Sequence, residues 1–355
     1  MGARAIVPRP EHRAETLTLL NGVLRPNHPP TIELEYPLAF ARANDRNARV
    51  VMEGDRVVSH ARFVPMDYRV GETSLRVGVI GSIATRSNAR GRGYSSACLA
   101  ACERGIADAG GSVAVLWTDE QEAYERRGYG RAGREDLFII PVRLLRHRND
   151  RSGIRPFVEN DEAAIAALHA QLRCRTFRTR DEWARLLRIP GMRTLVSVRA
   201  GEIVAYACCG KGADFAGVVH EWAGPAEEVF DLVLEQARAG GRDEIVLLSP
   251  PGQGRLRRPL RERGVPPHEG ALAMMRIVHA ERFARAVDRY LEQTPEAEHR
   301  VLAEGDDRFL LRGPHGDRAV STAEMLRISL GAETPAAPPI SGLPMPFYLR
   351  GLDSV

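Results

Sequence analysis

Residues 79–96 read Val-Ile-Gly-Ser-Ile-Ala-Thr-Arg-Ser-Asn-Ala-Arg-Gly-Arg-Gly-Tyr-Ser-Ser, and this stretch sets the expectations for the rest of the chain. Its first half predicts a buried strand, its glycines predict a tight turn, and its end begins a helix that runs to about Ala109. Backbone N–H groups in the first turn of a helix have no acceptor within the helix, and the helix dipole adds partial positive charge there. The stretch therefore predicts a site for a phosphate or pyrophosphate.

Two further features narrow the ligand. The turn contains no lysine, because Lys211 is the only lysine of the chain, and this argues against the phosphate loop of nucleotide hydrolases. It also lacks the Gly-x-Gly-x-x-Gly pattern of dinucleotide-binding folds. The spacing Arg90-x-x-Gly93-x-Ser95 instead resembles the Gln/Arg-x-x-Gly-x-Gly/Ala loop of the GCN5-related N-acetyltransferase (GNAT) superfamily, with Ser95 replacing Gly or Ala. That loop binds the pyrophosphate of acetyl-coenzyme A (acetyl-CoA). A glycine turn without a ligand is the alternative for these six residues alone.

The elements around the loop strengthen this resemblance. Apolar runs predict strands at residues 48–52, 57–65, 75–85 and 113–117, which puts the loop inside a right-handed strand–helix–strand unit. The next helix ends in Tyr124-Glu-Arg-Arg-Gly128-Tyr129, similar to the Tyr-x-x-x-Gly-Phe/Tyr motif that the superfamily has after this strand. The resemblance implies that Tyr124 is a general acid that protonates the departing CoA thiolate. A tyrosine that only packs at the helix end is the alternative.

The second half of the chain repeats the plan of the first. Strands are expected at residues 154–156, 194–199, 203–209, 218–223 and 245–248, with helices at residues 161–173 and 226–239. The pyrophosphate pattern does not precede the last helix, so this half should not bind CoA. We predict an α/β fold with a mixed α+β sheet and tandem GNAT-type domains, the second one degenerate. The expected domains are residues 1–143, which bind acetyl-CoA and carry catalysis, residues 153–279, and a C-terminal α+β segment of residues 280–355.

The ends of these domains carry three further expectations. Residues 144–153 are polar and predict a linker, and residues 335–339 are rich in proline. Residues 343–355 are apolar and aromatic, so we expect this tail to be docked rather than frayed. The whole organisation resembles the enhanced-intracellular-survival group of bacterial acetyltransferases, some of which acetylate aminoglycosides. That resemblance implies that the terminal carboxylate, here on Val355, enters the active site and helps to deprotonate the acceptor amine.

The expected site combines a cofactor part with an acceptor part. The residues expected to bind acetyl-CoA are Ile83, Ala84, Thr85, Arg90, Gly91, Arg92, Gly93, Tyr94, Ser95 and Ser96. The proline-broken segment of residues 25–37 is a candidate lid for a cationic acceptor. The residues expected to contact the acceptor are Glu33, Glu35, Tyr36, Asp119 and Glu120. The general base stays open between Glu35, Asp119, Glu120, Glu122 and the terminal carboxylate. Each of these acidic residues, taken alone, is more often a solvated surface group.

Composition limits the partners. The five cysteines show no Cys-x-x-Cys pair, which argues against a disulfide framework and a zinc site, so we expect cysteines in the core and no metal. A net charge of +4 with dispersed arginines does not indicate nucleic acid binding. No apolar run reaches the length of a membrane span, and the first ten residues lack a signal peptide, so we expect a cytoplasmic protein without a membrane partner.

Together these features predict an acyltransferase that moves an acetyl group from acetyl-CoA directly to a primary amine. The expected acceptor is a small cationic molecule, with an aminoglycoside antibiotic as the best candidate, which would make the protein an antibiotic-resistance enzyme. A protein or peptide N-acetyltransferase and a non-catalytic CoA-binding sensor are the alternatives. Association into a homo-oligomer stays open.

Overall fold

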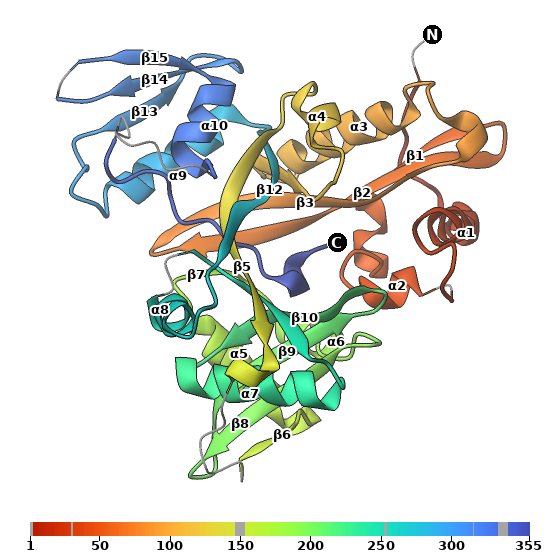
Figure 1. Cartoon of the computed structure of the whole chain (residues 1–355). Helices are drawn as coiled ribbons and strands as arrows, with labels where there is room; N and C mark the ends of the chain where they lie inside the picture. Colours follow the sequence, from red (N-terminus) through yellow and green to blue (C-terminus); the bar gives the residue numbers. More distant parts are fainter. Residues whose placement is uncertain (1–2, 30, 146–152, 252–253, 315, 333–339) are drawn as a thin grey trace. The chain divides into compact units, whose positions relative to one another are not determined.

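The computed structural model describes residues 3–29, 31–145, 153–251, 254–314, 316–332 and 340–355 (Figure 1). The chain forms two compact units, one made of residues 1–133, 271–347 and 354–355, and the other of residues 134–270 and 348–353. We call them unit 1 and unit 2. Their limits differ from the expected domains, which were contiguous in sequence. Residues 146–152 of the expected linker and the proline-rich residues 335–339 lie outside the described residues.

Unit 1 is built on a mixed sheet with the strand order β1-β2-β3-β4-β12. Its strands are β1 (Ala48–Glu53), β2 (Arg56–Val70), β3 (Thr73–Thr85), β4 (Val113–Leu116) and β12 (His268–Ile277). The pairs β1–β2, β2–β3 and β4–β12 are antiparallel, whereas β3 and β4 are parallel. Helix α3 (Tyr94–Asp108) connects the two parallel strands. The predicted strand–helix–strand unit is therefore confirmed.

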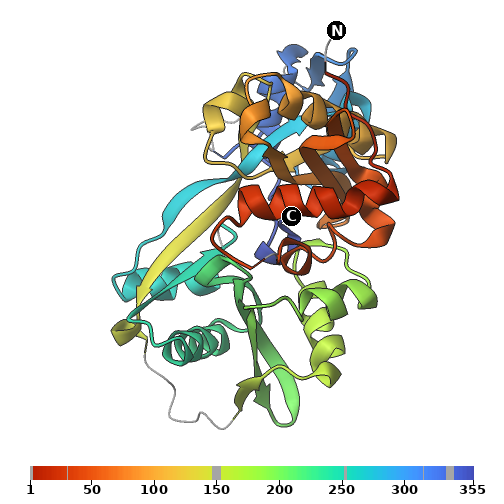
Figure 2. The same ribbon diagram turned by 90° about the vertical axis from the view of Figure 1, so that its right-hand side faces the viewer.

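Helices cover both faces of this sheet. Helix α3 lies on one face, and α1 (Arg13–Leu24) with the short α2 (Ile32–Glu35) lies on the other (Figures 1 and 2). The α3 face encloses a core in which Phe63 of β2 packs with Cys98 and Ile106 of α3. A Cβ atom at Gly105 would lie 2.7 Å from the Phe63 ring, so a glycine is needed where α3 approaches β2.

Other elements of unit 1 surround this sheet. Near the N-terminus, an isolated antiparallel bridge pairs Ile6 with Val50. A separate antiparallel sheet, β13-β14-β15, accompanies the C-terminal helices. The bounds of these elements are η1 (Pro10–His12), η2 (Arg42–Asn47), η3 (Ser87–Ala89), α4 (Gln121–Glu125), α9 (Ala280–Leu291), β13 (Arg300–Ala303), β14 (Arg308–Arg312), β15 (Arg318–Ser321) and α10 (Thr322–Leu330).

Unit 2 repeats the plan with the strand order β5-β11-β10-β9-β8-β6. The pair β10–β11 is parallel and is connected by α7, and the other pairs are antiparallel. The strands are β5 (Gly130–Pro141), β6 (Ile154–Pro156), β7 (Cys174–Thr176), β8 (Arg193–Arg199), β9 (Glu202–Lys211), β10 (Asp214–Ala223) and β11 (Glu244–Ser249). The helices and turns are η4 (Val142–Leu144), η5 (Glu159–Asp161), α5 (Glu162–Ala170), α6 (Arg180–Leu186), α7 (Ala226–Ala239), α8 (Gly254–Glu262) and η6 (Gly351–Asp353).

The last strand of each sheet comes from the other half of the chain. Strand β5 follows α4 of unit 1 but pairs with β11, whereas β12 follows α8 of unit 2 but pairs with β4. This exchange explains why the units are not contiguous in sequence. It also explains why their limits fall inside β5 and β12, between residues 133 and 134 and between residues 270 and 271.

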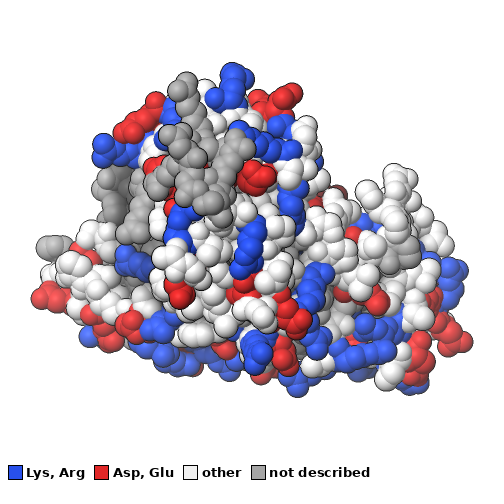
Figure 3. All heavy atoms as spheres, turned by 90° about the horizontal axis from the view of Figure 1, so that it is seen from below, with Lys and Arg blue, Asp and Glu red and all other residues white. Residues whose placement is uncertain are grey.

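The mixed α/β fold class is thus as predicted. Cys98, Cys102, Cys208 and Cys209 are buried and take part in no disulfide bond, in line with the expected core role. The apolar tail is buried at Leu343, Phe347 and Leu352. Basic and acidic side chains are intermixed over the face seen in Figure 3. Among the described residues, none of the helices combines the length and apolar character of a membrane span.

Candidate functional site

The turn before α3 has the geometry of an anion site. Gly91 and Gly93 adopt positive φ angles of 76° and 78°, and a Cβ atom on either would meet no described atom within 4 Å. Gly93 is the N-terminal cap of α3, and the first backbone bond of the helix runs from the Ala97 N–H to the Gly93 carbonyl at 3.0 Å. The N–H groups of residues 91–96 donate to no atom of the described residues. They remain available to an anion at the positive end of the helix dipole.

Two side chains of this loop bind a residue that sequence reasoning missed. Glu53, at the end of β1, accepts hydrogen bonds from the Tyr94 hydroxyl at 2.6 Å and from the Arg92 guanidinium at 2.9 Å. The hydrogen bond from Tyr94 is the main cause that lowers the pKa of the Glu53 carboxyl group. Because Glu53 ends a strand about 40 residues before the loop, sequence spacing gave no signal for this contact.

The end of β3 offers a backbone edge beside the loop. Strand β4 pairs with β3 at residues 77–79, whereas β2 pairs with β3 up to the Ser59–Thr85 pair. Within the described residues, β4 therefore provides no pairing partner for the expected cofactor residues Ile83, Ala84 and Thr85. Their backbone N–H and C=O groups on that side can form hydrogen bonds with an extended ligand.

Strand β3 also bends in this region. The register with β2 shifts between the Arg62–Gly81 and His60–Ala84 pairs, and Ser82 adopts a positive φ of 51°. The buried His60 donates from Nδ1 to the Ser82 carbonyl at 2.7 Å. Burial lowers the pKa of His60 to about 3, so its ring is neutral. Bulges and strained residues are common next to ligand sites because they redirect the backbone.

Tyr124 lies in α4, and its motif reaches the loop. The Arg127 guanidinium donates to the Ser96 hydroxyl at 2.9 Å and lies 5.7 Å from the centre of the Tyr124 ring. The Tyr124 ring also packs edge-on against Tyr129, with 5.7 Å between ring centres. Burial raises the pKa of the Tyr124 hydroxyl, so it stays protonated at neutral pH. The two motifs found in the sequence are therefore in contact, and one of them presents a protonated phenol.

The end of the chain lies against the same sheet. A Cβ atom at Gly81 of β3 would lie 1.8 Å from the backbone oxygen of Val355, so the last residue packs directly on this glycine. Gly81 neighbours the bulged Ser82 and is the register partner of Arg62 on β2. The backbone oxygen of Val355 thus lies at the bulge of β3.

Residues just before the end are anchored within unit 2. The Asp353 carboxylate accepts hydrogen bonds from Arg178 at 2.7 Å and from the Thr176 hydroxyl at 2.7 Å. Arg178 also donates to Glu221 at 2.9 Å, and both Arg178 and Glu221 are buried. The Lys211 ammonium donates to the Gly351 carbonyl at 2.9 Å. A buried ionic network thus fixes residues 351–353.

The candidate acceptor residues differ in availability. Glu35 is 1% exposed and accepts from Arg25 Nε at 2.8 Å through one oxygen and from the Thr31 hydroxyl through the other. Both of its oxygens are therefore engaged inside unit 1, a role that its sequence context did not indicate. Glu33 and Tyr36 are half-buried on the same segment. Asp119 and Glu120 are exposed just before α4 and Tyr124.

The amino-acid sequence of this region matches a known family. Residues 9–132 match the acetyltransferase (GNAT) domain family. Residues 9–132 are therefore similar to a GNAT domain. The match includes β1 to β4, α3 and the Tyr124 motif, and it indicates N-acetyltransferase chemistry in general, without naming the acceptor. No curated protein sequence matches the chain.

Solved structures resemble more of the chain than the GNAT domain alone. A GCN5-related N-acetyltransferase from Anabaena variabilis is 14% identical with a TM-score of 0.65, over 92% of this chain and 89% of that one. Eis1 from Mycobacterium abscessus is 16% identical with a TM-score of 0.59, over 94% and 90%. Saccharomyces cerevisiae N-myristoyltransferase with bound myristoyl-CoA is 10% identical with a TM-score of 0.52, over 78% of each chain. At these identities the likeness concerns the fold.

The site within residues 9–132 fits an acyl-CoA. The uncapped N–H groups at α3 suit a pyrophosphate, the free edge of β3 suits the amide groups of pantetheine, and Tyr124 provides a proton donor. When bound there, acyl-coenzyme A would supply the thioester that carries the acyl group.

Proposed function

We propose that the GNAT domain transfers an acetyl group from acetyl-CoA directly to a primary amine of a small cationic molecule. The observation that carries this proposal is the hydrogen bond between Arg127 and Ser96, which joins the anion-binding loop to the Tyr124 motif. A phosphate-binding helix end alone serves many ligands, but a protonated phenol beside it is what an acyl transfer to an amine needs.

Each part of the reaction has a candidate group in unit 1. The acceptor amine must lose a proton as it attacks the thioester carbonyl, and the sulfur must gain one as the carbon–sulfur bond breaks. In this proposal the carboxylate at Val355 takes the amine proton, directly or through water, and Tyr124 protonates the sulfur. Backbone N–H groups at the end of β3 stabilise the negative charge on the carbonyl oxygen.

An aminoglycoside is the acceptor that we propose. The fold likeness to Eis1 supports this choice, together with the carboxylate at Val355 and the exposed acids Asp119 and Glu120, which can attract a polycation. Glu35 is not part of this proposal because its oxygens are bound within unit 1. An aminoglycoside acceptor implies a role in antibiotic resistance, with the cytoplasm as the proposed place of action.

The test is a panel of amines assayed for thiol release from acetyl-CoA. Aminoglycosides, polyamines and peptides with a free N-terminus are compared at equal concentration, and mass spectrometry identifies the acetylated nitrogen. The proposal expects turnover with aminoglycosides above that with the other amines. Faster turnover with peptides than with aminoglycosides would show that the acceptor is a protein or peptide amine. Binding of acetyl-CoA without consumption by any amine would overturn the enzymatic role in favour of a CoA sensor.

A further inference from the structure

A pocket of about 350 Å³ opens on the α1 face of unit 1, away from the loop before α3. It lies between the N-terminal segment, α1, the turn η2 and strand β2, all of which belong to unit 1. A volume of this size is at the lower end of what small-molecule sites occupy. The pocket is lined by Val7, Pro8, Arg9, Pro10, Arg13, Thr16, Leu17, Phe40, Arg42, Asp45, Arg46 and Arg62.

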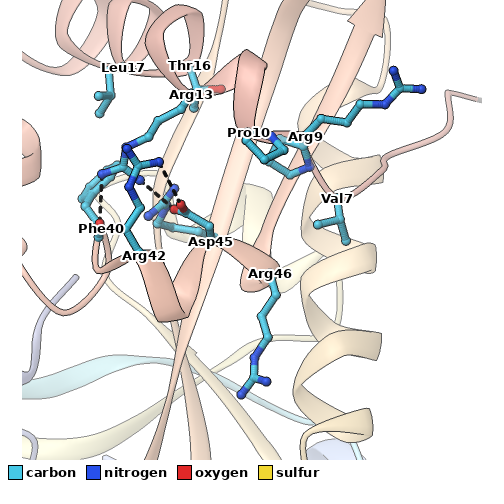
Figure 4. A pocket seen from close by; sticks show the side chains of 12 residues that line it. Val7, Arg9, Pro10, Arg13, Thr16, Leu17, Phe40, Arg42, Asp45 and Arg46 are labelled. Carbon is cyan, nitrogen blue, oxygen red and sulfur yellow. Dashed lines mark hydrogen bonds and ion pairs between the residues drawn. The ribbon is translucent and has the colours of Figure 1, made fainter.

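The charges in this lining are unbalanced, because it contains five arginines and one aspartate. Arg13 and Arg42 share the Asp45 carboxylate, at 2.7 Å and 3.7 Å. Figure 4 shows these two side chains meeting at Asp45, whereas Arg9 and Arg46 extend away from it. One carboxylate therefore serves two guanidinium groups at the centre of the pocket, and this leaves an excess of positive charge there.

Arg62 adds a buried charge to the same pocket. Its residue is 3% exposed, and its guanidinium lies 3.9 Å from the centre of the Phe40 ring. The guanidinium also donates to the Ala39 carbonyl, and no carboxylate of the described residues lies within ion-pair distance of it. Burial lowers the pKa of Arg62 to about 10, so the group is still charged at neutral pH. Asp45 attracts Arg62 only from beyond ion-pair distance and is itself bound by Arg13 and Arg42, so the buried Arg62 cation gains from an anionic ligand.

The remaining lining is apolar. Leu17 of α1 and Phe40 lie beside Arg13 and Arg42, and Val7, Pro8 and Pro10 also belong to the lining. A ligand that fills the pocket therefore meets both guanidinium groups and carbon. Planar guanidinium groups bind carboxylate and phosphate oxygens in the same way.

We propose that this pocket binds a small organic oxyanion, a carboxylate or phosphate ester that carries an apolar group. Its oxygens contact Arg13, Arg42 and Arg62, and its apolar part packs on Leu17 and Phe40. The site is separate from the acetyl-CoA loop and does not depend on the proposed transfer. A polycationic acceptor is excluded from this pocket by the same charges.

The test is calorimetric titration of the full chain, first at an ionic strength of about 0.15 M and then at higher salt concentrations. The probes are benzoate, phenyl phosphate and inorganic phosphate, with benzylammonium as the probe of opposite charge. We expect saturable binding of benzoate or phenyl phosphate that weakens as salt is added. Their relative affinities distinguish a carboxylate from a phosphate ester. Absence of saturable binding for all three oxyanions, or stronger binding of benzylammonium, would overturn the proposal.

Two variants and one control locate the binding. Arg42→Gln removes a largely exposed guanidinium, so the fold should be kept. It should lower the affinity for the oxyanions about tenfold, as expected for the loss of a charge-assisted hydrogen bond. Arg104→Gln removes an exposed arginine on α3 outside the pocket and should leave binding unchanged. Leu17→Ala should lower the affinity for phenyl phosphate more than the affinity for inorganic phosphate. Equal affinities for the wild type, Arg42→Gln and Arg104→Gln would show that the anions bind elsewhere.

Discussion

Val355 packs on Gly81 so closely that a methyl group on that glycine would lie 1.8 Å from the backbone oxygen of Val355. Gly81 has no positive φ, so an alanine there is acceptable to the strand backbone and conflicts only with the end of the chain. The position of the terminal carboxylate therefore depends on which residue occupies position 81 of β3.

Gly81→Ala should therefore displace Val355 without unfolding unit 1. If the carboxylate is the base, we expect acetyl transfer to fall by about 10² or more, the lower part of the range for acid–base groups. The rate of thiol release and the unfolding temperature are measured together. Gly22→Ala, in α1 with open space around it, is the control and should keep full activity. Unchanged activity of Gly81→Ala would remove the carboxylate from the mechanism.

Gly93→Ala should weaken the binding of acetyl-CoA. Gly93 has a φ of 78° at the N-terminus of α3, and an alanine in this conformation costs about 1 kcal/mol and shifts the backbone. Gly54→Ala, at a φ of 58° in the turn between β1 and β2, carries a similar strain outside the loop. Both variants should lose similar stability, but only Gly93→Ala should raise the KM for acetyl-CoA. Equal KM values in both variants would contradict the loop assignment.

Tyr124→Phe tests the acid. The pKa of Tyr124 is raised by burial, so the phenol holds its proton throughout the neutral range. Its loss should lower the rate of thiol release about 10²-fold while the affinity for acetyl-CoA is kept, because the ring still packs on Tyr129. Tyr129→Phe serves as the comparison, since its hydroxyl is bound to Glu103 at 2.9 Å. A rate for Tyr124→Phe equal to that of the wild type would assign this tyrosine a packing role only.

Local patterns predicted much of the fold and only part of the site. The strands and helices around residues 79–96 could be predicted from the spacing of apolar residues, because this spacing is a local property of the sequence. The exchange of β5 and β12 could not be predicted in this way, because the pattern of apolar residues in a strand does not show which other strand it pairs with. Glu35 shows the same limit. Its acidic, proline-broken surroundings predicted an exposed lid, but Arg25, ten residues earlier, binds its carboxylate in the fold.

Glu35→Gln should destabilise unit 1. The change leaves the buried Arg25 guanidinium without the charge of this carboxylate, and breaking a buried ion pair costs about 3–5 kcal/mol. Chemical denaturation measures the free energy of unfolding, and Glu33→Gln, at a half-buried position, should change it little. If Glu35→Gln instead kept full stability and lost only activity, Glu35 would return as a candidate for acceptor binding.

The only lysine of the chain should make stability depend on pH in a defined direction. Lys211 is buried on β9, and burial lowers its pKa from 10.5 to about 7. Between these two values the unfolded chain binds a proton that the folded chain does not, so raising the pH favours the folded state. The Lys211 contribution to the free energy of unfolding should be lowest below about pH 7. It should then rise by up to about 1.4 kcal/mol per pH unit and level off above about pH 10.5.

Lys211→Met isolates this contribution from the other groups that titrate in the same range. It replaces the ammonium by a side chain of similar length and removes the hydrogen bond to the Gly351 carbonyl. Denaturation curves of both proteins between pH 6 and 10 give the difference in the free energy of unfolding. This difference should shift in favour of the wild type as the pH rises. A difference that stays constant across the range would show that Lys211 titrates alike in the folded and unfolded chains.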